Sequence, residues 1–171
     1  MQDSRRWWGR PSGRLLRWGA ASVSGRAQAR SQHDQWRRQV RREAYTQYLV
    51  ALHDRDVAMD DVLRALDAEA PDQAVVEGRV EAFVALAREV HRAAEVVLLE
   101  GPAGVGEAVS GVAEASGALS GVMRRMVDDA RCGDGSRRAE DLALAAERSD
   151  ALWEAVKGFR AVAGGVLGNG D

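Results

Sequence analysis

The chain has 171 residues, the length of a single domain with a buried core. Its one cysteine, Cys132, excludes an intrachain disulfide and fits a reducing compartment. No stretch approaches the roughly 18 apolar residues of a membrane-spanning helix. The net charge of -2 combines two opposed parts: residues 1–42 carry eleven basic and two acidic side chains (+9), and residues 43–171 carry 13 basic and 24 acidic ones (-11).

The longest helical pattern runs from residue 36 to residue 70 and contains no glycine or proline. We expect this helix to begin between residues 25 and 34 and to end before Pro71, because the residue before a proline leaves the α region. Its apolar seam recurs at alternating steps of four and three, the spacing of a helix that faces other helices. The predicted seam comprises Tyr45, Leu49, Leu52, Asp56, Met59, Leu63, Leu66 and Ala70.

Three further segments, residues 73–100, 105–131 and 137–163, carry the same kind of seam at similar length. Asp72 and Ser136 are suited to cap the N-termini of the first and last of these helices. Gly101-Pro102 and the turn at residues 132–135 separate the helices.

Such short joints force neighbouring helices to be antiparallel. The sequence therefore predicts an all-α, up-down-up-down antiparallel four-helix bundle with coiled-coil-like seams, a long first helix and a basic N-terminal arm. We assign residues 1–30 to a partly disordered Trp/Arg-rich arm, residues 31–164 to the bundle and residues 165–171 to a flexible tail. One core should contain the following side chains: Leu52, Phe83, Leu119 and Leu152.

Residues 96–108, VVLLEGPAGVGEA, resemble the strand and phosphate loop of an AAA-type ATPase. The departures remove the chemistry, since Glu107 replaces the phosphate-binding lysine and Ala108 the Mg²⁺-binding hydroxyl. We interpret this stretch as a Gly-Pro joint between two helices.

Other chemistry has little support in the sequence. A ferritin-like di-iron site requires Glu-x-x-His motifs, and the chain has none. His53 with Asp54 and Asp56, and His91 with Glu95, fit solvated or ion-paired roles better than a metal site. We therefore predict no catalytic residues, no metal and no cofactor, and a protein that is not an enzyme.

The N-terminal arm combines guanidinium groups with indole rings, a composition typical of segments that lie at an interface. It also resembles a twin-arginine export signal, although Arg17 and several small residues interrupt its apolar region. A solvated Arg-rich tail is the third interpretation. The predicted anionic-surface residues are Arg5, Arg6, Trp7, Trp8, Arg10, Arg14, Arg17, Trp18, Arg37, Arg38, Arg41 and Arg42.

Residues 36–49 read W-R-R-x-x-R-R-E-A-Y-x-x-Y-L. This pattern resembles a recurrent stretch in uncharacterised actinobacterial helical proteins, often found just after one N-terminal membrane helix. The resemblance implies a helical domain at the cytoplasmic face of the membrane and carries no activity. Here Arg and Gly stand where the membrane helix would be, so we expect a cytoplasmic protein that is at most peripheral at the inner membrane face.

Two functions fit these features. The first is a non-enzymatic helical interaction module whose basic arm engages an anionic partner, either a protein or a membrane surface. The alternative is a nucleic-acid-binding protein whose arm places Arg on phosphates and Trp on bases. The oligomeric state and the identity of the partner stay open.

Overall fold

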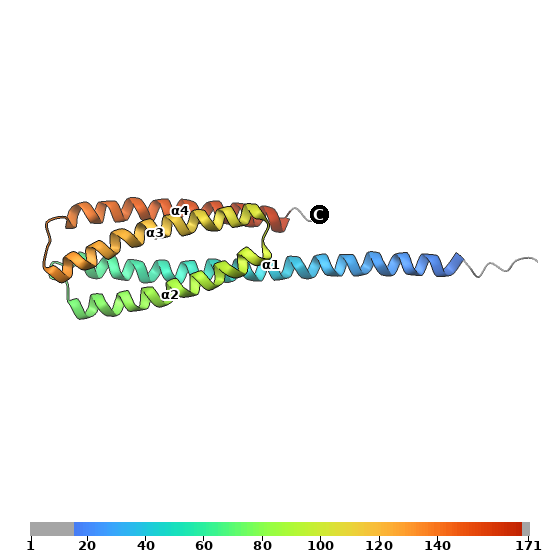
Figure 1. The fold of residues 1–171 in the computed structure, drawn as a ribbon, viewed down its shortest axis with the longest axis horizontal. Coiled ribbons are helices and arrows are strands. Elements are labelled where there is room, and N and C mark those ends of the chain that lie inside the picture. Colours follow the sequence, from blue (N-terminus) through green and yellow to red (C-terminus); the bar gives the residue numbers. More distant parts are fainter. Residues whose placement is uncertain (1–15, 169–171) are drawn as a thin grey trace, which may run out of the picture. The chain divides into compact units, whose positions relative to one another are not determined.

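The computed structural model describes the backbone of residues 16–168 and the side chains of residues 28–168. The described chain forms four α-helices and no strand: α1 (Leu16–Asp67), α2 (Gln73–Glu100), α3 (Ala103–Cys132) and α4 (Arg138–Gly168). It divides into two units, residues 1–38 and residues 39–171. In the second unit α1 to α4 run in alternating directions (Figure 1), which confirms the predicted four-helix bundle.

Local chemistry fixes the ends of the helices. Helix α2 has the predicted bounds, because the Asp72 side chain accepts hydrogen bonds from the N–H groups of Ala74 (2.9 Å) and Val75 (3.4 Å). At its other end the Gly101 N–H bonds to the Val97 carbonyl, and Pro102 follows. Helix α3 ends at Cys132, and the φ of 70° at the following Gly133 is a left-handed conformation that favours glycine.

Several boundaries differ from the sequence-based expectation, and three of them differ by three residues or more. Helix α1 already begins at Leu16 and ends at Asp67, three residues before Ala70. Helix α4 continues past Ala163 to Gly168, because Val166 and Leu167 pack against the core and offset the poor helix propensity of the glycines nearby.

The capping prediction for Ser136 was wrong. Its hydroxyl and its N–H both hydrogen bond to the Asp134 carboxylate, which lowers the pKa of Asp134. Helix α4 begins at Arg138, one residue later than predicted, with Glu140 and Asp141 in its first turn. Carboxylates in this position are favoured by the helix dipole.

One apolar cluster forms the core of the bundle, and it contains Leu52, Phe83, Leu119 and Leu152 as predicted. Its most buried aromatic contact joins α1 to α4, where the Tyr48 ring meets Phe159 edge-on at 5.0 Å. Such edge-to-face contacts add to the burial of apolar area.

The most buried seam of α1 differs from the predicted one at alternate positions, although Leu49 and Leu63 still pack against the core. Asp56 is exposed, and Arg55 occupies the seam with only 3% of its surface accessible. Side-chain length separates the two positions: the long arginine side chain reaches Ser120 and Phe83 on other helices, whereas the short aspartate stays at the surface, where water solvates it. The observed seam runs in steps of three and four through Tyr45, Tyr48, Leu52, Arg55, Met59, Val62 and Leu66.

Two arginines bind the free carbonyls at helix C-termini. Arg41 Nε donates to the Glu100 carbonyl at the end of α2 (2.7 Å). Arg138 donates to the carbonyls of Asp67 and Ala68 at the end of α1. Because the last carbonyls of a helix lack intrahelical partners, these bonds satisfy groups that would otherwise need water.

Replacing Leu52 with alanine should lower the free energy of unfolding by about 2–5 kcal/mol, because the side chain is almost fully buried. Urea denaturation measures this change. Val50→Ala, on the exposed side of the same helix, is the matched control and should change stability by less than about 1 kcal/mol. A loss below that limit for Leu52→Ala would mean that the core has been assigned to the wrong face.

Replacing Gly117 with alanine should raise the free energy of unfolding by up to about 1 kcal/mol, since the glycine lies inside α3 and open space surrounds the added methyl group. Gly133→Ala is the contrasting variant. Its positive φ should make the same methyl group cost about 1–2 kcal/mol. Equal effects of the two substitutions in urea denaturation would contradict the different roles assigned to these glycines.

The Asp141→Asn variant tests the ion pair between α3 and α4. Arg125 hydrogen bonds to the nearly buried Asp141 carboxylate (Nε–Oδ1 3.0 Å), which holds the pKa of Asp141 below its usual value. A depressed pKa contributes stability that is present above the unfolded value of about 3.9 and is lost as the pH falls through the folded value. Between about pH 5 and pH 3, the melting temperature of the parent protein should fall more steeply than that of Asp141→Asn. Parallel curves would contradict this role, and the exposed substitution Glu81→Gln provides a charge-matched control.

Candidate functional site

The predicted anionic-surface residues fall into four groups. Arg17 and Trp18 lie in α1, where only the backbone is described. Arg37 and Arg38 lie in the first unit, and Arg41 and Arg42 in the second. The remaining six lie outside the described residues: Arg5, Arg6, Trp7, Trp8, Arg10 and Arg14.

We define the cationic segment as residues 16–38, the helical part of the first unit. Every side chain from residue 28 to residue 37 is exposed, which is unusual for ten consecutive residues of one helix. Trp36 is 60% exposed, and its ring stacks on His33 with 5.8 Å between the ring centroids. The segment thus exposes both an indole ring and the side chain of Arg37.

Arg41 has a structural role in addition to its charge. It is half-buried and donates to the Glu100 carbonyl, so it contributes to the bundle. Arg42, its neighbour in sequence, is exposed. The paired arginines of the sequence motif therefore have different environments.

The phosphate-loop interpretation of residues 96–108 is excluded by the fold. Val96 to Leu99 are part of α2, and Gly101-Pro102 joins α2 to α3. A phosphate loop needs a strand at this place. The interpretation as a helix joint is confirmed.

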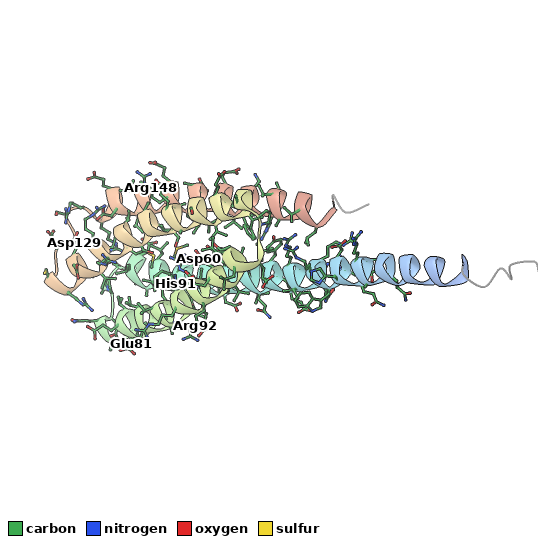
Figure 2. The ribbon with its side chains drawn as sticks, turned by 45° about the vertical axis from the view of Figure 1, so that its right-hand side comes forward. Asp60, Glu81, His91, Arg92, Asp129 and Arg148 are labelled. Atoms are coloured by element: carbon green, nitrogen blue, oxygen red, sulfur yellow. The ribbon has the colours of Figure 1, made fainter. Side chains whose placement is uncertain are left out.

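The candidate metal ligands lie at the surface. His91 Nε2 is 3.9 Å from Glu95 Oε1, and both side chains are exposed on α2. Within residues 28–168 no three His, Cys, Asp or Glu side chains gather in a way that could hold a metal ion. Charged side chains such as Glu81, Arg92 and Arg148 instead project from the outside of the bundle (Figure 2).

A groove between α1 and α4 was not anticipated from the sequence. It has a volume of about 240 Å³. Apolar walls and a few polar groups make it a suitable place for a small molecule. The α1/α4 groove is lined by Leu49, Leu52, His53, Arg55, Asp56, Ser149, Leu152, Trp153, Val156 and Arg160.

Arg55 is buried and lines this groove, and its guanidinium lies against α2 and α3. Its Nη2 donates to the Ser120 hydroxyl (2.9 Å), and its guanidinium carbon lies 4.7 Å from the centre of the Phe83 ring. Burial lowers the pKa of Arg55, while nearby Asp56 and Tyr48 raise it. An arginine nonetheless keeps its charge in a protein, so the core of the bundle holds a cation.

Trp153 and Arg160 form the rim of the groove. The indole is half exposed, and the guanidinium carbon of Arg160 lies 5.2 Å from its centre. Lys157 also approaches this ring, but its ammonium group is paired with Glu154 (2.9 Å). The rim is therefore cationic and aromatic.

The sequence holds a signal for this groove that the leucine-based seam concealed. Tyr48, Arg55 and Val62 recur every seven residues, one position before Leu49, Asp56 and Leu63. Each of the two sets contains one charged side chain, Arg55 or Asp56. Only arginine has a long apolar chain that can be buried, and this criterion selects Arg55. Trp153 and Arg160 cannot be placed at its side until the pairing of α1 with α4 is known.

No family model, curated protein or solved structure matches the chain. The resemblance of residues 36–49 to actinobacterial helical proteins accordingly stays a prediction. Among the helices of residues 16–168, none is both long enough and apolar enough to cross a membrane.

Proposed function

We propose that the chain is a non-enzymatic interaction module that binds an anionic surface, such as an acidic membrane leaflet, through its N-terminal residues 1–38. The observation that carries the proposal is the charge distribution. Residues 1–42 bear a formal charge of +9, whereas residues 43–171 bear -11. An anionic surface attracts the first part and repels the second, so contact is confined to the N-terminal part.

The pattern of α1 supports this assignment. Continued toward the N-terminus, the seam positions of the bundle fall on Arg38, Asp34 and Ser31. A helix with no apolar stripe has no face to bury in a bundle. The exposed side chains of residues 28–37, Trp36 among them, are thus available to a partner.

Nucleic acid is the less favoured partner. The arm could also bind nucleic acid, with its arginines on phosphates and its tryptophans stacked on bases. The four helices of the bundle, however, are already occupied with packing against one another, so none of them is left to enter a groove of DNA. No helix-turn-helix arrangement is present in the described residues.

Binding to vesicles of mixed neutral and anionic phospholipid, measured by flotation, tests the proposal. The double variant Arg30→Gln/Arg37→Gln removes two exposed cations of the cationic segment. At about 1 kcal/mol per arginine near an acidic leaflet, binding at low salt should weaken about thirtyfold. The control Arg64→Gln/Arg92→Gln removes the same charge from exposed positions in the bundle and should bind like the parent chain.

Deleting residues 1–30 should abolish vesicle binding and leave the melting temperature nearly unchanged. Unfolding of the deletion variant would instead make this region part of the fold. If the full chain ignores anionic vesicles but shifts random DNA with a steep dependence on salt, the nucleic-acid function replaces the one proposed. If the full chain binds neither anionic vesicles nor DNA, both proposed functions are rejected.

A further inference from the structure

We propose that the α1/α4 groove binds a small amphipathic carboxylate, whose apolar part packs against Leu52, Leu152 and Val156 and whose carboxylate pairs with Arg55. Arg160 strengthens binding from the rim. This site lies within the second unit and is independent of the function proposed for residues 1–38.

The first argument is that no carboxylate pairs directly with Arg55, although the charge of the exposed neighbour Asp56 raises its pKa. Arg55 is 3% exposed, and its one hydrogen bond goes to the neutral Ser120 hydroxyl. Within residues 28–168, no carboxylate forms an ion pair with Arg55 within 4.0 Å. A buried cation is costly unless it is paired, and an anionic ligand would supply the missing ion-pair partner.

The second argument is the position of Arg55 in the sequence. It occupies a seam position between Leu52 and Met59, where an apolar side chain would pack at no electrostatic cost. Replacing buried charges by apolar residues of similar volume often stabilises a protein. A charged residue at a seam position that favours an apolar one is expected where function requires the charge.

The shape and lining of the groove define the class of ligand. Its volume of about 240 Å³ is below the roughly 300–1,000 Å³ of pockets for drug-sized molecules, so the ligand is small. Five of the lining side chains are apolar or aromatic, which favours a ligand with an apolar body: Leu49, Leu52, Leu152, Trp153 and Val156. Asp56 also lines the groove and would repel a dianion such as phosphate more strongly than a monoanion, so we infer a monoanion.

Arg160 provides a second cation from α4. Among the described residues it has no carboxylate within ion-pair distance, and its guanidinium rests on the Trp153 ring. Stacking on an aromatic face leaves the edge of a guanidinium free to donate hydrogen bonds. Arg160 is exposed, so its contribution should be smaller than that of Arg55.

The test uses phenylacetate and its neutral analogue phenylacetamide as probes on the full chain, with binding followed by ligand-observed NMR titration. Phenylacetate should bind at least about tenfold more tightly than phenylacetamide, since charge-assisted hydrogen bonds separate the two. Arg55→Met, an apolar replacement with a similar unbranched stem, should weaken phenylacetate binding at least about tenfold. Its melting temperature should equal or exceed that of the parent chain, which a purely structural role would not produce.

Arg160→Gln should weaken phenylacetate binding several-fold without affecting the amide, and it provides a test should Arg55→Met fail to fold. Arg92→Gln, an exposed substitution on α2 outside the groove, should leave binding unchanged. Equal affinities for acid and amide would overturn the proposal. So would unchanged acid binding in Arg55→Met, or an absence of binding at millimolar phenylacetate and hexanoate.

Discussion

The bundle depends on one stripe of α1 that must be buried against three other helices. Tyr48 packs on Phe159 of α4, Arg55 meets Phe83 of α2 and Ser120 of α3, and the rest of the stripe fills the same core. Without this stripe α1 would be a mostly polar helix with nothing to hold it. N-terminal to Tyr45 the seam positions become polar, and residues 28–37 are exposed. The core thus ends where the apolar periodicity ends.

Much of the fold could be predicted from residue spacing, because each seam repeats over several turns. Phe83, Leu119 and Leu152 share the core with Leu52, and the Asp72 cap and Pro102 fix both ends of α2. Spacing alone could not choose between Arg55 and Asp56, since both positions fit an alternating pattern. That choice depends on how far a charged group can reach from a core position. The end of α4 was also missed, because burial of Val166 and Leu167 outweighs a local run of glycines.

Arginine is the residue whose role the sequence predicts least well in this chain. Arg41 and Arg138 satisfy helix carbonyls, Arg125 pairs with a buried aspartate, and Arg37 is exposed. These environments arise from neighbours far away in the chain, so the residue type and its flanking sequence do not distinguish them. Composition could therefore predict a cationic surface, but it could not predict which arginines form stabilising contacts within the bundle. The groove was missed for the same reason, since its two walls are about a hundred residues apart.

The charge of Arg55 lowers the stability of the empty bundle, and the same charge would favour the binding of an anionic ligand. An apolar residue at this seam position would complete the core between Leu52 and Met59. The arginine instead retains a desolvated cation, and the contacts it makes to a hydroxyl and to an aromatic face replace only part of its hydration. In a small apolar groove, a ligand carboxylate would replace more of the lost hydration energy of Arg55 than a water molecule could. The reason is that attraction between charges strengthens as the dielectric constant falls. The same burial that makes Arg55 costly to the empty bundle is therefore what would make the groove selective for an anion.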